Sequence, residues 1–456
     1  MALPEADLFR FLLAASLLLF SAHVVGVFFA RWHQPRVIGE ILGGFLLGPT
    51  VLGAFAPAVQ AELIPSSGAA ATALGAVYQL GLIWLMFAAG TELRTLPSGR
   101  QRTVALSVAL AGMALPFAAG IAAFAALQPT NLAGSANDTA ALGIVFIAAL
   151  ALTSIPVISR IMMDLGILST PFARVVLGAA VIEDIVLFGL LGIAVGLTQT
   201  SAERLGLVSL LGIKAGSPAG AIYYGAVVTT ALGGAIALSR WRSRPNSLLD
   251  RVCRDLTLQI LFVLAVVTGI LLISAPPLFG GLVAGLVVGS GETTEATERV
   301  KAFGLAFFVP IYFALVGFRL DLNVLQPTFF IAFFLFACAV KAGGVYLGAR
   351  ISSVDPPRAS DLAVAMNARG GPGIVLATVA LDAKIIDNGF YASLVMLAIL
   401  SSLLAGWWLE RRVDAKAGFH ALGPGWDDPP LPENQLQGID PVDLKTPSAA
   451  GQHRSG

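Results

Sequence analysis

Long apolar runs separated by short polar segments dominate the first 410 residues of the chain. Several of these runs exceed the roughly 18 residues that a helix needs to cross the hydrocarbon core of a bilayer. The pattern predicts thirteen transmembrane helices, of which the ninth is short and rich in glycine. They cover residues 8–32, 36–55, 74–93, 102–127, 139–163, 171–198, 218–240, 255–274, 277–291, 300–319, 328–350, 358–381 and 388–408.

The composition excludes a soluble globular protein, because 57% of the residues are hydrophobic and only 12% are charged. We therefore expect an all-α polytopic membrane protein over residues 1–414, embedded in a lipid bilayer. Residues 415–456 are rich in proline, glycine and acidic residues, and we expect them to form a disordered cytoplasmic tail. The net charge of +1 gives no indication of a nucleic-acid partner. No Walker A motif is present, and no cofactor is expected.

The positive charges give the orientation of the predicted helices. With the N-terminus outside and the C-terminus in the cytoplasm, 21 of the 28 lysines and arginines lie on the inner side and five on the outer side. This bias is the one that the positive-inside rule requires. We expect an integral protein of a bacterial inner membrane. The two remaining cations, Lys341 and Arg369, lie inside predicted spans.

The chain also contains an internal repeat. VIGEILGGFLLG (37–48) aligns with LFGGLVAGLVVG (278–289), and LMFAAGTEL (85–93) is similar to IYFALVGFRL (311–320). The matched helices are seven apart in the order, so they cross the bilayer in opposite senses. This predicts two inverted repeats of five helices, an architecture that many secondary transporters share.

The fourth helix of each repeat carries residues that interrupt helices. Proline removes a backbone donor, and glycines weaken a helix further. A break at membrane depth is tolerated where it lines a cavity or is buried in protein. We expect a broken helix in each repeat, the alternative being a continuous helix with a proline kink. The residues are Thr153, Ser154 and Pro156 in the first repeat and Gly370, Gly371, Pro372 and Gly373 in the second.

Two adjacent acids, Glu183 and Asp184, lie in the helix that follows the first break. Adjacent residues are about 100° apart around a helix, so the two carboxylates have different neighbours. An acid within a span is a candidate functional residue, and the alternative is a buried ion pair that fixes helix packing. Lys341 is the expected partner of one of them. Arg369 is expected to balance a helix end or a loop acid, in a structural role.

These residues indicate a mechanism. A carboxylate in a poorly hydrated cavity resists ionisation, and a neighbouring carboxylate strengthens that resistance. A proton and a small monovalent cation then compete for one site, and oxygens of Thr153, Ser154 and the unwound segment complete the shell of the cation. A site with neither would carry an uncompensated charge through a medium of low dielectric constant, which enforces exchange.

Six stretches together resemble the monovalent cation:proton antiporter 2 family of Na+(K+)/H+ exchangers, over about residues 8 to 410. They are QPRVIGEILGGFLLGPTVLG, GLIWLMFAAGTEL, ALTSIPVISRIMMDLGILS, GAAVIEDIVL, FFVPIYFALVGFRLDL and NARGGPGIVLATVAL, and Lys341 adds to them. By resemblance, Asp184 is the essential carboxylate that binds Na+ or K+ and the proton. Glu183 takes the preceding position and pairs with Lys341, while Thr153 and Ser154 match the unwound crossover.

The resemblance also implies a homodimer and an elevator-like motion. It implies a dimer panel at about 8–93 and 255–319, a core at about 102–198 and 328–408, and a linker helix at about 218–240. Two features depart from the family. Position 183 carries Glu where relatives often carry Asp, and the tail is too short for the nucleotide-binding domain of glutathione-gated relatives.

The sequence therefore predicts a Na+/H+ antiporter rather than an enzyme. A K+/H+ antiporter is the main alternative, since cavity size is not encoded in any motif. An organic-anion symporter on a similar fold and a membrane sensor with a structural Glu183–Lys341 pair are further alternatives.

Overall fold

The computed structural model is helical over nearly all of the residues that it describes. It describes residues 3–32, 34–65, 67–92, 99–168, 170–198, 248–273, 276–289 and 294–414, with positions 223, 227, 230 and 234 between them. The predicted linker helix at 218–240 therefore lies almost entirely outside the described residues. The predicted tail at 415–456 lies entirely outside them.

The helices of the first half are α1 (Glu5–Arg31), α2 (Arg36–Leu47), α3 (Leu52–Phe55), α4 (Pro57–Leu63), α5 (Gly68–Glu92), α6 (Gly99–Leu127), α7 (Thr139–Ala151), α8 (Ile155–Asp164) and α9 (Pro171–Thr198). Those of the second half are α12 (Leu248–Arg254), α13 (Leu256–Leu272), α14 (Pro277–Gly289), α15 (Glu295–Phe303), α16 (Val309–Phe318), α17 (Pro327–Ile351), α18 (Pro356–Ala365), α19 (Gly370–Asp382) and α20 (Asn388–Asp414).

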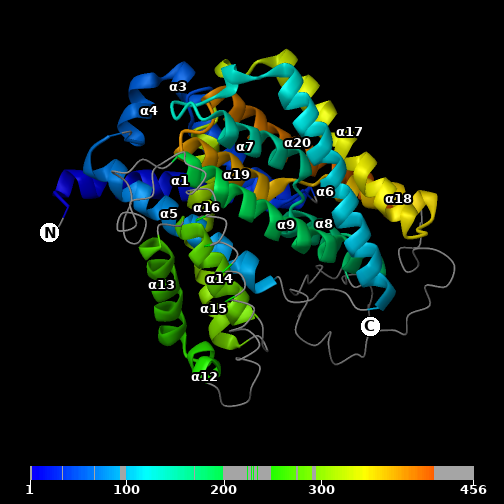
Figure 1. Ribbon diagram of the computed structural model, residues 1–456. Helices are drawn as coiled ribbons and strands as arrows, with labels where there is room; N and C mark the ends of the chain where they lie inside the picture. The colour runs from blue at the N-terminus through cyan, green and yellow to red at the C-terminus, as the bar shows by residue number, and fades with distance from the viewer. Residues whose placement is uncertain are drawn as a thin grey trace, which may run out of the picture.

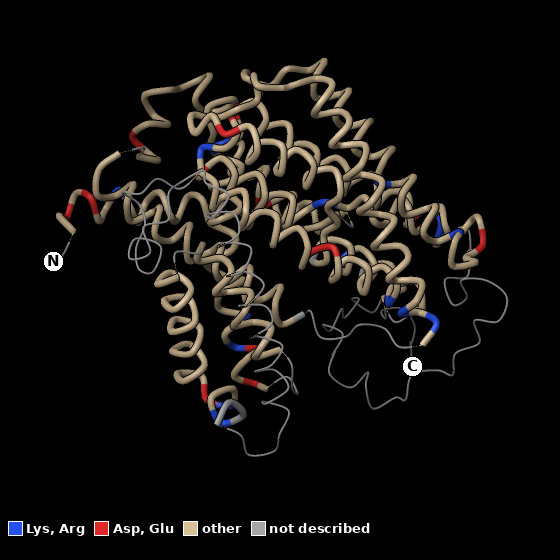
Figure 2. The backbone as a smooth tube through the Cα atoms, viewed as in Figure 1, with Lys and Arg blue, Asp and Glu red and all other residues tan. Residues whose placement is uncertain are grey.

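Helices occupy the twelve predicted spans outside the 218–240 segment. Within the described residues, nine helical segments are long and apolar enough to cross a membrane, and three more apolar helices are shorter. Figure 2 shows most of the charged positions near helix ends, with few inside the bundle. The chain thus has the architecture of a polytopic membrane protein.

Some predicted spans differ in detail from their helices: α5 begins at Gly68, six residues before the span predicted at 74–93. The span predicted at 300–319 begins earlier, as α15 at Glu295, because the Thr294 hydroxyl accepts a hydrogen bond from the Thr297 amide and caps the helix. A wider π-helical turn at Gly304–Phe308 then joins α15 to α16. Pro310 follows that turn and removes a backbone donor, which favours a local departure from α geometry.

The helices pack as two bundles (Figure 1). The first bundle contains α1, α2, α5 and α13 to α16, and the second contains α6 to α9 and α17 to α20. Within the first bundle, glycines allow backbones to touch: a methyl group at Gly44 would overlap the Ala314 carbonyl, and one at Gly317 would overlap the Ile41 carbonyl. Such close crossings of small residues are a usual way for helices to associate inside a membrane.

Two helical stretches of the second bundle, at 139–164 and 356–382, are interrupted near their middles. The chain leaves helical geometry at Leu152 to Ser154 between α7 and α8, and at Met366 to Arg369 between α18 and α19. Residues of both interruptions are buried, so their backbone groups need partners within the protein. Those partners define the candidate site.

Candidate functional site

The two interruptions cross and bond to each other. The Thr153 hydroxyl donates to the Met366 carbonyl at 2.6 Å, and the Ser154 amide donates to the Ala368 carbonyl at 2.6 Å. Each unwound segment thus satisfies backbone groups of the other. The predicted residues Thr153 and Ser154 lie at this crossing, but their side-chain oxygens are already engaged with the second interruption.

Ser154 also joins the beginnings of two helices. Its hydroxyl oxygen accepts from the Gly371 amide at 3.1 Å and from the Val157 amide at 3.4 Å, so it caps both α19 and α8. The Gly370 amide donates to the Ser402 hydroxyl of α20 at 3.2 Å. A side chain at Gly370 would collide with Val157, so this position requires glycine for a close helix approach.

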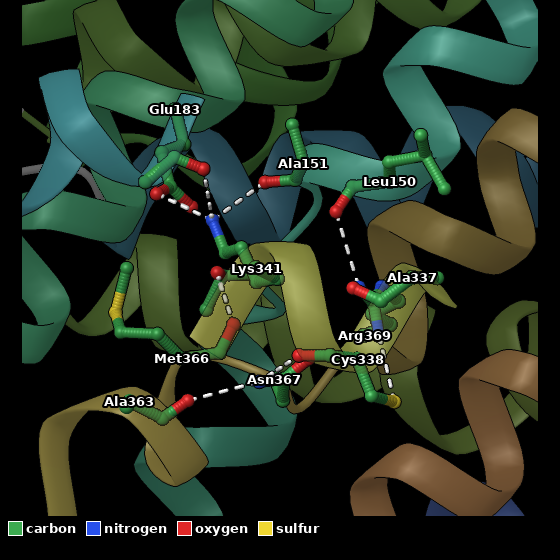
Figure 3. A network of polar contacts seen from close by, with 12 residues as sticks. Leu150, Ala151, Glu183, Ala337, Cys338, Lys341, Ala363, Met366, Asn367 and Arg369 are labelled. Atoms are coloured by element: carbon green, nitrogen blue, oxygen red, sulfur yellow. Dashed lines mark hydrogen bonds and ion pairs between the residues drawn. The ribbon is translucent and has the colours of Figure 1, made fainter. Parts of the chain in front are cut away.

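Two cations cover the C-terminal end of α7. Arg369 donates to the Leu150 carbonyl at 3.1 Å and to the Ala337 carbonyl at 2.8 Å, and Lys341 donates to the Ala151 carbonyl at 2.7 Å (Figure 3). The last carbonyls of a helix lack partners inside the helix and carry partial negative charge. The positive charges at this broken end donate hydrogen bonds to these carbonyls and balance their partial negative charge.

The C-terminal end of α18 is compensated differently. The Asn367 side-chain amide donates to the Ala363 carbonyl at 2.9 Å, and Thr153 covers the Met366 carbonyl, as described above. Both donors, an amide and a hydroxyl, are neutral, and Figure 3 shows the contact between Asn367 and Ala363. The two broken ends are therefore matched in position but not in charge, and the positive groups gather at the end of α7.

Glu183 and Lys341 form an ion pair in the interior. The Lys341 Nζ lies 2.6 Å from Glu183 Oε1, and both side chains are 0% exposed. The ammonium also lies 3.4 Å from the Gly112 carbonyl of α6. An added methyl group at Gly112 would stand 3.1 Å from Glu183 Oε1, so glycine here leaves room for the pair.

Asp184 has no comparable partner. It is 4% exposed, and its Oδ1 has no hydrogen-bond partner within the described part of the chain. Its helix face is shared with Ala180, four residues earlier. Ala180 and Val181 cluster with Ile155, the first residue of α8. Asp184 thus lies one turn along α9 from the residues that pack against the start of α8.

This arrangement gives the two neighbouring acids different environments. Lys341 neutralises Glu183 and bonds to the end of α7, so Asp184 is left without a cation, although each acid keeps one buried oxygen without a donor in the described structure. A buried carboxylate oxygen without a partner is costly unless a proton or a cation occupies it. Chemically, the site can bind a proton or a small hard cation at Asp184.

Several polar residues that the fold uses were not predicted from the sequence. Asn367 stands beside the predicted break, and its polarity within an apolar span was an available signal. Asp361 and Glu40 are buried acids inside predicted spans. Asp361 bonds to Arg412 at 2.8 Å, and Glu40 lies 3.1 Å from Arg36. Gly112 acts through its carbonyl and its lack of a side chain, for which a single sequence has no signal.

Comparison with known proteins gives several full-length relatives. The Na(+)/H(+) antiporter NhaS4 of Synechocystis sp. is 29% identical over 394 residues, covering 84% of this chain and 92% of the relative. The Na(+)/H(+)-K(+) antiporter GerN of Bacillus cereus is 26% identical over 411 residues, covering 90% and 97%.

Other relatives are longer than this chain. The K(+)/H(+) antiporter 1 of Saccharomyces cerevisiae is 29% identical over 424 residues, covering 88% of this chain. The chain spans 46% of the length of that yeast protein and 45% of that of the cation/H(+) antiporter 18 of Arabidopsis thaliana.

A solved structure shares the fold. The sodium proton antiporter MjNhaP1 from Methanocaldococcus jannaschii superposes with a TM-score of 0.57 at 15% identity, covering 89% of this chain and 98% of that chain. Residues 16–414 match the family described as sodium/hydrogen exchanger, transmembrane. This integral membrane chain therefore belongs to that family of monovalent cation:proton antiporters, which are secondary transporters and not enzymes.

Proposed function

We propose that the chain exchanges Na+ for H+ across the membrane and that the two ions compete for the carboxylate of Asp184. The observation that carries this proposal is the difference between the two adjacent acids. Each acid keeps one buried oxygen without a donor, but Glu183 is neutralised by its ion pair with Lys341 through Oε1, whereas Asp184 has no ion pair within the described residues. Glu183, Thr153 and Ser154 are proposed as the surrounding ion- and proton-binding residues.

Competition at one carboxylate produces exchange for an electrostatic reason. Asp184 occupied by H+ is neutral, and Asp184 occupied by Na+ is a compensated pair. An empty, ionised Asp184 would have to cross the low-dielectric interior as a bare charge, at a cost of several kcal/mol. Reorientation of the empty carrier is therefore rare, and each passage in one direction carries a cation or a proton.

Lys341 and Arg369 are proposed as charge-balancing residues. Both bind carbonyls at the end of α7 and keep positive charge beside the acids. Gly370, Gly371 and Pro372 begin α19 and form the second break. These residues hold the geometry of the site and do not exchange ions themselves.

The helix contacts support an inverted-repeat architecture. In the proposed repeats, α2 corresponds to α14 and α5 corresponds to α16. In the structure, α2 packs on α16 and α14 packs on α5, so each glycine-rich helix contacts the following helix of the other repeat. This exchange of partners is what a two-fold axis in the membrane plane produces. We propose thirteen spans in total, including 218–240.

The two bundles support an elevator mechanism. We propose that the first bundle is a dimer panel, at about 8–93 and 255–319, that anchors the protein as a homodimer. The second bundle, at about 102–198 and 328–408, is the moving core and contains both broken helices and Asp184. We place the N-terminus outside and the C-terminus in the cytoplasm of a bacterial inner membrane, from the distribution of Lys and Arg.

A K+/H+ exchanger is the second candidate. Relatives named as Na(+)/H(+) and as K(+)/H(+) antiporters have the same 29% identity to this chain, so identity does not separate the two cations. An organic-anion symporter is disfavoured, because it would not require an unpartnered acid beside a lysine pair.

The test is an exchange assay in proteoliposomes with a trapped pH-sensitive dye. We expect Na+ added outside to release protons from acidified vesicles, and K+ in a separate run to give a weaker signal. Asp184→Asn should remove the signal. Asp355→Asn is the matched control, since Asp355 lies at the start of α18 and makes no side-chain capping bond. Exchange that survives Asp184→Asn would refute the assigned site, and a larger signal with K+ would favour the second candidate.

A further inference from the structure

Four polar contacts cross the boundary between the first and second bundles at one end of the molecule. They involve α16 and the residue that follows it, the later turns of α19, the first turn of α20 and the middle of α5. The contacts are Arg319 to Asp382 at 2.7 Å, Tyr78 to Asp382 at 3.1 Å, Tyr312 to Thr378 at 3.0 Å and Tyr391 to the Val316 carbonyl at 2.8 Å.

Asp382 is the centre of the outermost contacts. Its Oδ1 accepts from Arg319 Nη1, and its Oδ2 accepts from the Tyr78 hydroxyl. The Arg319 guanidinium also lies over the Tyr78 ring, 4.7 Å from its centroid, in a cation–π contact. One acid of the second bundle thus holds two side chains of the first bundle.

Buried aromatic residues lie beneath this cluster. Tyr312 and Tyr391 are 0% exposed, and Tyr312 stands against Tyr78 with ring centroids 5.1 Å apart. Thr378, which bonds to Tyr312, is also 0% exposed. The boundary between the bundles is therefore sealed at this end by two layers, a charged outer one and an aromatic inner one.

The outer layer is suited to repeated breaking. The Arg319 and Asp382 side chains are 38% and 35% exposed, so water can replace their contact at little cost. The Glu183–Lys341 pair is fully buried, and separating it would leave uncompensated charge. The buried pair lies within the second bundle, whereas the hydrated pair joins the two bundles. Of these two ion pairs, a relative movement of the bundles breaks only the hydrated one, together with the hydrogen bonds of Tyr78, Tyr312 and Tyr391 across the boundary.

We propose that Arg319, Asp382 and Tyr78 are positioning residues for transport: they latch the second bundle against the first and close this mouth of the site. The latch opens once in each cycle, when the second bundle moves and this end becomes accessible. The proposal rests on the exchange function proposed above. It adds that these three residues set the balance between the state in which this end is closed and the state in which it is open. None of them touches the transported ion.

The experiment measures access to the sealed boundary independently of transport. In a Cys253→Ala/Cys338→Ala background, Thr378→Cys reports opening through its rate of labelling by a water-soluble maleimide in proteoliposomes. We expect Asp382→Asn and Arg319→Gln each to raise that rate about threefold or more, because each removes the hydrated ion pair. The reciprocal exchange Arg319→Asp/Asp382→Arg should restore slow labelling.

Ala148→Cys is the matched control, since Ala148 is equally buried in α7 inside the second bundle and should be labelled at the same slow rate in every variant. Tyr391→Cys is the second reporter across the same boundary and replaces Thr378→Cys if that protein does not fold. If the labelling rate of Thr378→Cys is the same with and without Asp382→Asn, the latch proposal is overturned. A rise at Ala148→Cys of the same size, which would indicate general loosening, also overturns it.

The outcome for the exchange function is separate. Asp184→Asn should leave the labelling of Thr378→Cys sensitive to Asp382→Asn while removing exchange. If Asp184→Asn retains exchange, the proposed ion site fails and the latch stands on its labelling result. If exchange depends on Asp184 but the labelling rate of Thr378→Cys is unchanged by Asp382→Asn, the latch is refuted and the proposed ion site stands.

Discussion

Lys341→Ala tests the energetic role of the buried ion pair. The substitution removes the 2.6 Å contact with Glu183 and the 2.7 Å bond to the Ala151 carbonyl, both in the interior. Removing one partner of a fully buried pair costs about 3–5 kcal/mol, and a hydrogen bond from a charged group contributes about 1.5–3 kcal/mol. These effects overlap in one ammonium group, so we expect a loss of about 4 kcal/mol rather than their sum.

The measurement is thermal unfolding of the purified protein in one detergent, followed by tryptophan fluorescence. Lys301→Ala is the matched control, because Lys301 lies 3.6 Å from Glu298, whose side chain is 57% exposed, and such a pair is worth about 0–1 kcal/mol. Adding Glu183→Gln to Lys341→Ala removes the unpaired carboxylate, so the double variant should regain about 2 kcal/mol.

Two results would refute this reasoning. One is a Lys341→Ala protein as stable as Lys301→Ala. The other is a double variant no more stable than Lys341→Ala, which would mean that the unpaired Glu183 carboxylate is not what destabilises the single variant. We also expect Lys341→Ala to lower stability before it abolishes exchange, since Asp184 remains in place.

Three further substitutions test the surroundings of the site by the same unfolding assay. Asp361→Asn weakens the bonds from α18 to Arg412 and should cost about 2–3 kcal/mol, whereas Asp355→Asn in the same helix should change stability little. Ser154→Ala removes the acceptor that caps α8 and α19 and should cost about 1–2 kcal/mol; an unchanged midpoint would show that water replaces it. Gly317→Ala forces a methyl group onto the carbonyl of α2 and should cost about 1–3 kcal/mol or more, while tolerance would mean that the crossing can widen.

The sequence by itself determined the class of the protein and the positions of its helices. A span requires only enough consecutive apolar residues, which is a local property, so twelve predicted spans coincide with helices. The helix breaks could also be predicted from the sequence, because Pro156, Pro372 and the adjoining glycines weaken the turn of helix in which they lie. Helix ends were less well predicted, as α15 shows, since capping by Thr294 is a weak local signal.

The tertiary structure alone decided which groups meet. Lys341 reaches Glu183 across 158 positions of sequence, and Arg369 reaches the Leu150 carbonyl across 219. A single sequence marks such residues as charged and buried but does not indicate the carbonyl that each one covers. The unpartnered oxygen of Asp184 and the contact between Arg319 and Asp382 are likewise products of packing. Hydrophobic length acts along the chain, whereas electrostatic pairing depends on distances of a few ångströms that only the folded backbone sets.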